Sequence, residues 1–387
     1  DNSITERGYY TYKIVPGNDM GRGDRASTSA YIGNGDPLGV SNLKAAVNGN
    51  GATLSWTAPT KGKLDSYINT DALTYDIIRF ANSETEGTKI AEGIKANSYN
   101  DNSLDKIAKY KYAVVAHTEM YASDSIWTEP VVAGPAIEVP STIGFADNDQ
   151  FNLWTVVDAN GNNSTWAYQS AQWGSMGGAY VSYNYDSMAA ADWLVSPRVR
   201  LEAGKHYKFT FDALPGNKKV VETLAVSMGQ GSDIALQDSI DQFDILSDAM
   251  VSLRVNLPVV AATGDYNIGL FYRSYMSANY MLTVNNVRVD EDHDGYISGK
   301  ALNADGSPIV GAAVYADAGA FAATTDANGA YTLKYLPKGK HTVNIVALGY
   351  EDGQQDVDVD EWATTSLNFN LKALPTFTVK GVVKDVA

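Results

Sequence analysis

Short stretches in which apolar and polar residues alternate make up most of the chain. Residues 10–15, 110–115 and 207–212 show this alternation clearly. A period of two points alternate side chains to opposite faces of a β-strand, so these stretches predict half-buried strands. Gly, Asn, Asp and Pro separate them, as in turns between strands. Helical periodicity is scarce, and residues 234–252 are the best candidate for a turn or short helix. The pattern therefore predicts an all-β chain built from sandwiches.

Part of this strand pattern recurs at a shift of 100 residues. Asp1-Asn2-Ser3 returns as Asp101-Asn102-Ser103, and the strand at residues 10–15 returns at residues 110–115. A repeat of this length is a whole small domain and not one turn of a solenoid. We therefore expect residue 1 to lie inside a domain that begins upstream, in a chain cut from a longer tandem array.

Composition sets the class of protein. A length of 387 residues predicts two to four domains, and 44% hydrophobic residues with 24 Tyr and 7 Trp describe a folded chain. The chain has no Cys, which excludes disulfides, Cys-ligated zinc and thiol catalysis. We find no apolar run long enough to span a membrane in this fragment.

The charge balance narrows the choice of partners. A formal net charge of −16 argues against nucleic acid, because binding to phosphates requires clustered Lys and Arg. The simplest interpretation of an acidic chain is solubility. The alternative is that some Asp and Asn side chains bind calcium, which takes oxygen ligands.

Residues 37–136 carry the first set of motifs. LSWTAP at residues 54–59 is followed by YDI at 75–77 and YKYAVV at 110–115. In this order they resemble a fibronectin type III domain, which implies a two-sheet sandwich with Trp56 between the sheets. Residues 1–36 then resemble the C-terminal strands of a truncated preceding copy.

Residues 137–290 carry the second set. WTVVDANGN at residues 154–162 and DWLVSP at 192–197 resemble the cleaved-adhesin (choice-of-anchor J, gingipain adhesin-like) jelly-roll domain. This resemblance implies an antiparallel sandwich with structural calcium and a binding or adhesive role. We expect Trp154 and Trp193 in its core. Tyr183 and Tyr185, which would share one strand face, are candidates for ligand stacking at the surface, the alternative being a place in the core.

Residues 291–373 carry the third set. DGSPIVGAAV at residues 305–314, TDANGAYTL at 325–333 and LPKGKHTV at 336–343 resemble a carboxypeptidase regulatory-like domain, a transthyretin-like sandwich. TVKGVVKD at residues 378–385 restarts its opening motif. Residues 374–387 are therefore expected to begin a second, truncated copy. The fold class predicted for the whole chain is a tandem array of β-sandwich domains.

The loop after residue 157 is the first candidate site. Asp158, Asn160 and Asn162 place oxygen side chains at alternate positions, a spacing that lets them converge on one cation. Asp147 and Asp149 could complete a Ca²⁺ site. The alternative is an ordinary Asx-turn loop.

The junction before residue 295 is the second candidate site. Asp290, Asp292 and Asp294 read like the opening of an EF-hand loop. The twelfth position is Ala301 where an EF-hand needs Glu, so a true EF-hand is excluded. Either an acidic linker or a junctional calcium site remains.

We recognise no catalytic motif in this sequence. The four His residues are scattered, and neither His-Glu-x-x-His nor Gly-x-Ser-x-Gly occurs. We expect a non-catalytic adhesion and spacer region of a large extracellular protein of the Bacteroidetes, secreted or on the cell surface, whose jelly roll contacts a glycan or a host or neighbouring surface protein. Self-association in a fibre is a further option. The alternative is a set of accessory domains of a secreted peptidase or glycosidase whose catalytic domain lies outside the fragment.

Overall fold

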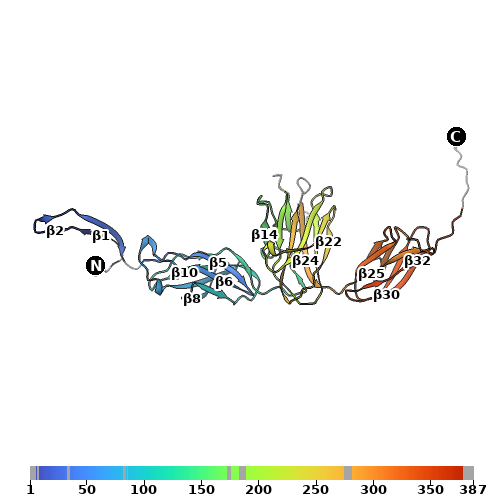
Figure 1. Cartoon of the computed structure of the whole chain (residues 1–387), viewed down its shortest axis with the longest axis horizontal. Helices are drawn as coiled ribbons and strands as arrows, with labels where there is room; N and C mark the ends of the chain where they lie inside the picture. Colours follow the sequence, from blue (N-terminus) through green and yellow to red (C-terminus); the bar gives the residue numbers. More distant parts are fainter. Residues whose placement is uncertain are drawn as a thin grey trace, which may run out of the picture. The chain divides into compact units, whose positions relative to one another are not determined.

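The computed structural model describes residues 6, 8–32, 35–81, 84, 86–171, 176–182, 189–273 and 281–377. Over these residues strands dominate, and the α-helical part is the short α1 (Asn148–Phe151). The all-β prediction is confirmed. The chain divides into two units, residues 1–290 and 291–387 (Figure 1). The helix considered for residues 234–252 is wrong beyond one 3₁₀ turn, η3 (Ile234–Leu236), because β21 (Asp238–Ile245) follows as a strand.

The N-terminal ribbon is an antiparallel pair made of β1 (Gly8–Ile14) and β4 (Ala26–Ile32). Its tip carries the two-residue strands β2 (Gly17–Asn18) and β3 (Gly21–Arg22). Within the described residues, this ribbon forms a two-stranded sheet of its own.

As far as its residues are described, the fibronectin-like sandwich (residues 37–136) has one sheet of three strands and one of five. The first sheet contains β5 (Ser41–Asn48), β6 (Gly51–Thr57) and β9 (Ser98–Asp101). The second contains β7 (Thr74–Ala81), β8 (Thr88–Ile94), β10 (Ala108–His117), β11 (Ile126–Trp127) and β12 (Val131–Ala133). Trp56 lies buried between the sheets, with its ring edge-on to Tyr75 at 5.1 Å between centroids. The two short 3₁₀ turns η1 (Lys63–Asp65) and η2 (Thr70–Ala72) precede β7.

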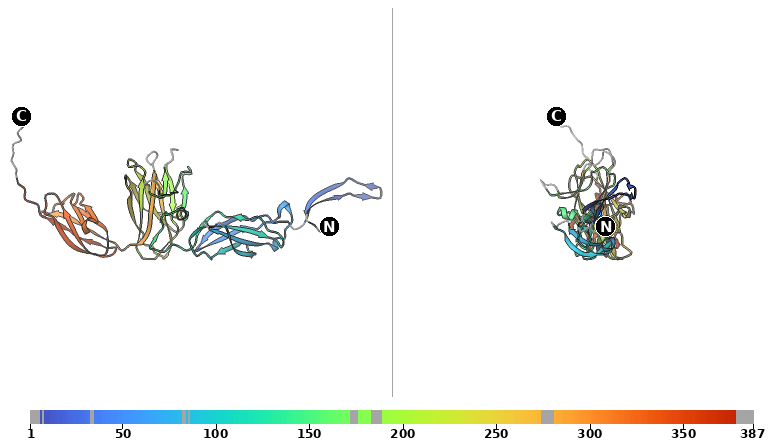
Figure 2. Two further views of the ribbon diagram at one scale, coloured as in Figure 1. Left: turned by 180° about the vertical axis from the view of Figure 1, so that it is seen from behind. Right: turned by 90° about the vertical axis from the view of Figure 1, so that its left-hand side faces the viewer.

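In its described residues, the jelly-roll sandwich (residues 137–290) has two sheets of six strands. One contains β13 (Ser141–Thr142), β15 (Ala167–Gln169), β16 (Gly178–Ser182), β19 (Tyr207–Pro215), β22 (Val251–Leu257) and β24 (Met281–Glu291). The other contains β14 (Thr155–Asp158), β17 (Ala191–Val195), β18 (Val199–Leu201), β20 (Glu222–Gly229), β21 and β23 (Gly264–Arg273). Figure 2 shows these strands from behind.

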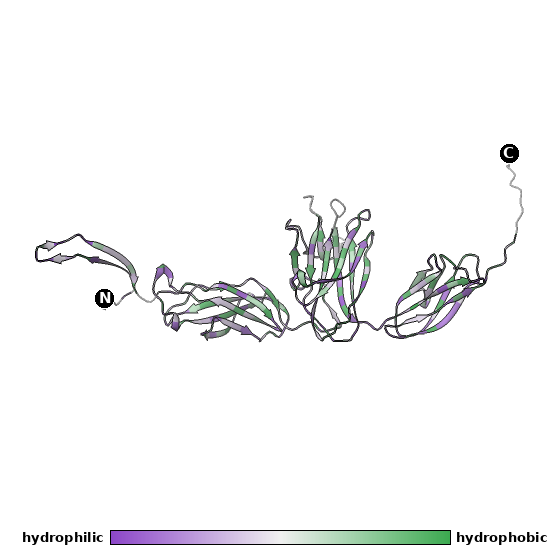
Figure 3. Ribbon diagram, in the orientation of Figure 1, coloured by the Kyte–Doolittle hydropathy of each residue, from purple (hydrophilic) through white to green (hydrophobic). Residues whose placement is uncertain are grey.

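Alternation explains how these sheets build their core. Along β19 every second side chain is buried and the ones between are half-buried, as its sequence pattern predicts. Figure 3 shows hydrophobic and hydrophilic residues alternating along the strands. Phe209 and Phe211 point inward on β19, with 5.4 Å between their ring centroids. The buried apolar side chains of residues 143–289 form one cluster, separate from that of residues 40–133.

The C-terminal unit (residues 291–387) is a smaller sandwich with its own core between residues 297 and 371. One sheet contains β25 (Gly295–Asn303), β28 (Ala330–Leu336), β31 (Thr364–Ser366) and β32 (Phe369–Leu371). The other contains β26 (Ala313–Ala316), β27 (Phe321–Thr324), β29 (Gly339–Val346) and β30 (Gly353–Val359). The turn η4 (Asp317–Gly319) joins β26 to β27. The predicted restart at residues 378–385 lies outside the described residues.

Candidate metal centre

Two carboxylates meet at one end of the jelly-roll sandwich. Strand β14 pairs with β17 so that Asp158 lies directly opposite Asp192. A further bond from the Ala159 amide to the carbonyl of Ala191, 3.0 Å long, extends the pairing into the loop. The register of the two strands therefore places the two acidic side chains side by side.

The loop after β14 folds around the carboxylate of Asp158. Its Oδ1 accepts a hydrogen bond from the Gly161 amide at 2.7 Å, and its Oδ2 accepts one from the Asn163 amide at 2.7 Å. Gly161 and Asn163 have φ angles of 71° and 62°, a left-handed conformation that Gly and Asn tolerate best. This is the Asx-turn geometry of the simpler interpretation, and it also holds the loop oxygens close together.

Asp192 is the unusual member of the pair. Its side chain lies on the inner face of β17 and is only 1% exposed. Burial first, and then the charge of Asp158, raise the pKa of Asp192 to about 6, although the Thr165 hydroxyl lowers it somewhat. Within the described part of the chain, neither Oδ1 of Asp192 nor Oγ1 of Thr165 makes a well-formed hydrogen bond. A buried carboxylate oxygen without such a bond is costly, and a cation beside it would offset that cost.

The donor set suits a hard cation. Asp158, Asp192, Thr165, Asn160 and Asn162 offer carboxylate, hydroxyl and amide oxygens, which are the ligands that Ca²⁺ takes. No group of three or more His, Asp or Glu side chains gathers in the described ranges, so the remaining ligands would have to be neutral oxygens. Sequence reasoning missed Asp192. The sequence did contain a hint. Asp192 lies two residues before the apolar Leu194, so in a strand both side chains point to the same, inward face.

Asp147 and Asp149 lie at the short helix α1, which precedes β14 in the chain. Asp147 is the N-cap of α1, where its Oδ1 accepts a hydrogen bond from the Gln150 amide at 2.8 Å. Both residues precede β14, whereas Asp158 ends it. The four residues of β14 lie between the two groups along the chain. Asp192 lies opposite Asp158, and a role of Asp147 and Asp149 at the same site stays a prediction.

The acidic residues at the junction are engaged in other bonds. Asp290 accepts from the guanidinium of Arg288, with a distance of 2.9 Å between Nη2 and Oδ1. In the C-terminal unit, the main chain of Trp362 donates to the carbonyl of Asp294 at 3.1 Å, and its indole donates to that of Asp292. The bonds from Trp362 use main-chain carbonyls and not the carboxylates, so the acidic linker and the junctional calcium both stay predictions.

The aromatic candidates divide into three groups. Tyr183 and Tyr185 lie outside the described residues. Trp154 is buried, and its indole donates to the carbonyl of Ile143 at 3.0 Å. The expectation for Trp193 is wrong: it lies half-buried on the outer face of β17 and stacks on Phe271 with 4.3 Å between centroids. Because Asp192 and Leu194 take the inward positions, Trp193 must point outward.

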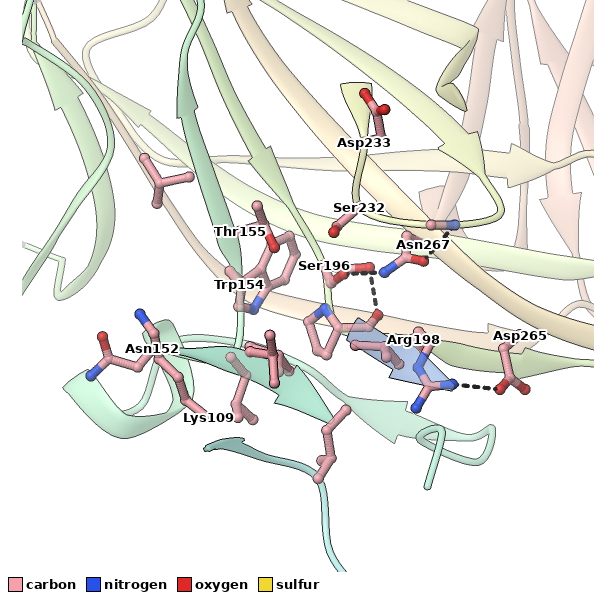
Figure 4. A pocket seen from close by; sticks show the side chains of 18 of the residues that line it. Lys109, Asn152, Trp154, Thr155, Ser196, Arg198, Ser232, Asp233, Asp265 and Asn267 are labelled. Atoms are coloured by element: carbon pink, nitrogen blue, oxygen red, sulfur yellow. Dashed lines mark hydrogen bonds and ion pairs between the residues drawn. The ribbon is translucent and has the colours of Figure 1, made fainter. Parts of the chain in front are cut away.

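A hollow borders the jelly-roll sandwich near Trp154, Ser196 and Arg198 (Figure 4). Some of its polar side chains are bonded to neighbouring groups. Asn267 donates to the carbonyl of Ser196 at 2.6 Å, and Arg198 pairs with Asp265 at 3.2 Å. These contacts stabilise the strand ends that line the hollow.

The strands and cores described above define a tandem array of β-sandwiches. In the described part of the chain, no helix is long and apolar enough to cross a membrane. Residues 296–372 match the family model of the carboxypeptidase regulatory-like domain, which confirms the resemblance seen in the sequence of the C-terminal unit. No curated protein matches the chain.

Several solved structures are similar to parts of the chain. The K3 cleaved adhesin domain of Lys-gingipain from Porphyromonas gingivalis W83 is 14% identical over 39% of this chain and 97% of its own, with a TM-score of 0.31. The K1 domain of the same protein is 16% identical over 39% of this chain and 96% of its own, with a TM-score of 0.30. An Fn3-like protein from Clostridium thermocellum is 26% identical over 24% of this chain and 92% of its own, with a TM-score of 0.19.

Proposed function

We propose that this chain is a non-catalytic adhesion and spacer region of a large bacterial protein that is secreted or held on the cell surface. The observation that carries the proposal is the architecture. The described residues bury their apolar side chains in three separate cores, and the polar loops between strands are left for recognition. A string of such modules places binding loops away from an anchor point, and several weak sites gain avidity when they engage together.

The positions of the histidines support a non-catalytic role. His117 pairs with Asp76 at 3.2 Å in the fibronectin-like sandwich, whereas His341 contacts Asp317 at 2.7 Å in the C-terminal unit. His293 lies 3.3 Å from a carboxylate oxygen of Glu361, also in the C-terminal unit. Each of these imidazoles contacts a carboxylate within its own sandwich. Such a pair also occurs at purely structural positions, and catalysis would need a nucleophile or a substrate within hydrogen-bond reach as well.

Calcium binding at the loop of Asp158 is part of the proposal. A cation between Asp158 and Asp192 would neutralise the buried carboxylate and lock the loop at this end of the jelly roll. The bound ion would then hold a recognition loop in one conformation, which lowers the entropy cost of binding. The jelly roll is the sandwich that we expect to contact a glycan or a host surface protein.

The test is direct binding of the whole chain. We expect the chain to bind at least one glycan or host surface protein on an array in millimolar Ca²⁺, and to bind it several-fold more weakly after chelation by EGTA. Asp158→Ala should reproduce the effect of EGTA, and Asp326→Ala, in a hydrogen-bonded loop of the C-terminal unit, is the matched control. Absence of binding to every glycan and protein offered would contradict the adhesive role.

The match to a carboxypeptidase regulatory-like domain favours a second candidate function. These sandwiches would then be accessory domains of a secreted peptidase or glycosidase, stabilising or positioning a catalytic domain encoded elsewhere in the same protein. The coding sequence on either side of the fragment distinguishes the two candidates. A catalytic motif there, together with loss of enzyme activity when residues 296–372 are deleted, would establish the accessory role.

A further inference from the structure

The C-terminal unit carries two aromatic residues in a backbone conformation that aromatic residues rarely adopt. Tyr335 and Trp362 have φ angles of 65° and 59°, in the left-handed region. For bulky residues this region is strained, and strain of this kind is concentrated at functional sites. Both residues lie at the end of the sandwich where β25 begins, because Tyr296 pairs with Lys334 on one side and with Thr364 on the other.

Trp362 is held in this conformation by two hydrogen bonds. Its main-chain amide donates to the carbonyl of Asp294 at 3.1 Å, and its indole N–H donates to the carbonyl of Asp292. The residue is nevertheless 46% exposed. Because the indole N–H is bonded within the protein, the apolar ring is the part of the side chain that meets the solvent. A strained residue that adds little to the core is better explained by binding.

Three polar side chains form a row beside this ring. The imidazole of His293 lies 6.1 Å from the ring of Trp362 between centroids, tilted by 33°. Its Nδ1 is 3.3 Å from Oε2 of Glu361, and Oε1 of Glu361 is 3.6 Å from Nζ of Lys338. The side chains of Lys338 and Glu361 are 59% and 30% exposed, so both are within reach of a ligand at the ring.

The pair of Lys338 and Glu361 has bonding capacity left. A distance of 3.6 Å between Nζ and Oε1 is longer than a hydrogen bond, so the two atoms attract each other through their charges alone. As far as the structure describes the chain, neither atom makes a well-formed hydrogen bond. A donor and an acceptor therefore lie next to each other, close to an apolar ring.

This combination selects a class of ligand. Lys338 would repel a cation. Glu361 would repel an anion, and so would Glu291, whose Oε2 lies 3.4 Å from Nε2 of His293. A neutral ligand that donates and accepts at adjacent atoms fits the pair best. Two neighbouring hydroxyls of a pyranose meet this requirement, and the C–H face of the same sugar can stack on an indole. A proline-rich peptide would stack as well, but its prolines have no N–H to donate to Glu361.

We propose that Trp362, Glu361 and Lys338 form a binding site for a neutral sugar ring on the C-terminal unit. The sugar stacks on Trp362, one hydroxyl donates to Oε1 of Glu361, and the neighbouring hydroxyl accepts from Nζ of Lys338. The site lies on a different sandwich from the loop of Asp158, so the inference stands independently of the proposed function.

Saturation-transfer NMR on the whole chain tests this site, because the method detects weak binding. The probes are cellohexaose, mannohexaose and galactohexaose, with hexalysine, hexagalacturonate and decaproline for comparison. We expect at least one neutral hexasaccharide to bind with a millimolar dissociation constant, and one face of a sugar ring to receive most of the saturation. Absence of binding by all three neutral sugars would overturn the proposal. Binding of a comparison probe in their place would overturn it too.

Trp362→Gly separates binding from folding. Gly adopts a φ of 59° without strain, so the C-terminal unit should stay folded, which protection of the β31 amides from hydrogen exchange verifies. We expect the variant to bind the hexasaccharide about 10-fold more weakly or worse, as for loss of an aromatic anchor. Trp127→Ala is the matched control, because Trp127 is 42% exposed on another sandwich, and its binding should be unchanged. Undiminished binding by folded Trp362→Gly would overturn the proposal.

Lys338→Ala tests the polar half of the site without altering a buried residue. Binding should weaken about 3-fold or more, because one hydroxyl loses its donor. Lys340→Ala is the control, since Lys340 pairs with Asp356 at 2.7 Å and is not part of the row. Equal effects of the two variants would contradict the assigned contact.

Calcium distinguishes this site from the jelly roll. EGTA and Asp158→Ala should leave binding of the hexasaccharide unchanged. A hexasaccharide that is lost with Asp158→Ala and kept with Trp362→Gly would bind to the jelly roll instead. That result would overturn the site at Trp362 while supporting the proposed function.

Discussion

Gly299 occupies a point on β25 where no side chain fits. A Cβ atom there would overlap the carbonyl oxygen of Leu367, whose amide donates to the carbonyl of Ser298 at 3.0 Å. Backbone that is held by its own hydrogen bonds cannot move aside cheaply. The backbone at Leu367 can approach β25 this closely only because residue 299 has no side chain.

Gly299→Ala should destabilise the C-terminal unit by about 2–3 kcal/mol, the cost of overpacking a site that cannot relax. Gly306→Ala is the control, because Gly306 has a φ of 86° but no heavy atom within 4 Å of an added Cβ. Its cost should be about 1 kcal/mol, from backbone strain alone. Hydrogen exchange of β25 amides in urea measures both. Equal losses in the two variants would contradict the assignment of the clash.

Asp101 illustrates how a buried charge can stabilise a sandwich. Burial raises its pKa, but hydrogen bonds from Ser103, Arg79 and Tyr112 together outweigh burial, and the pKa is lowered from its usual value of 3.8. A carboxylate with a depressed pKa stabilises the fold above its unfolded pKa, and this contribution is lost as the pH falls through the folded value. The fibronectin-like sandwich should therefore lose stability below about pH 4.

Asp101→Asn should lower the stability of the fibronectin-like sandwich by about 3 kcal/mol at pH 7, because Arg79 loses its charged partner. The difference between the two proteins should shrink as the pH falls below 4, since protonation removes the same charge from the original protein. Urea unfolding at several pH values measures it. A difference that is constant from pH 7 to pH 3 would mean that the charge of Asp101 does not stabilise the fold.

At the scale of elements, strand type was predictable and side-chain direction was only partly so. Alternation identified β10 and β19 because each buries one face, and it identified β1 because half-buried side chains alternate with exposed ones along most of it. It failed for β17, where we expected Trp193 in the core and the structure buries Asp192 instead. Neighbouring residues of a strand point to opposite faces, so an error of one residue exchanges the two faces. Composition alone cannot indicate that a carboxylate points inward, because the reason for it is a tertiary contact between two strands distant in sequence.

Asp192→Asn, at the end of the jelly roll that also carries Asp158, should affect the melting temperature differently with and without Ca²⁺. Without Ca²⁺, Asp192→Asn should leave the melting temperature unchanged or raise it, because it removes a buried charge. In millimolar Ca²⁺ the original protein should gain several degrees by mass action, and the variant should gain nothing. Differential scanning fluorimetry with Ca²⁺ and with EGTA measures this.

Glu222→Gln is the matched control for that experiment. Glu222 is also fully buried in the jelly roll, where its Oε2 accepts from the hydroxyl of Tyr272 at 2.7 Å. Because this carboxylate is hydrogen-bonded and does not belong to the loop of Asp158, the variant should be less stable to the same extent with and without Ca²⁺. An equal calcium response in both variants and the original protein would remove Asp192 from the site.

At the scale of the whole molecule, separate cores imply separate unfolding. The buried apolar residues fall into clusters that share no member between residues 40–133, 143–289 and 297–371. Free-energy changes add when the altered residues have no common partners. Asp101→Asn and Gly299→Ala should therefore shift different transitions, and their double variant should show each shift unchanged to within about 0.5 kcal/mol.

Coupling inside one sandwich provides the contrast. Asp101 and Tyr112 share a 3.0 Å hydrogen bond, so Asp101→Asn combined with Tyr112→Phe removes the same interaction twice. The double variant should be about 1 kcal/mol more stable than the sum of the two single losses predicts. Calorimetry of both double variants decides the matter. If Asp101→Asn and Gly299→Ala coupled as strongly as this pair, the two units would unfold together, and the chain would not act as a string of independent modules.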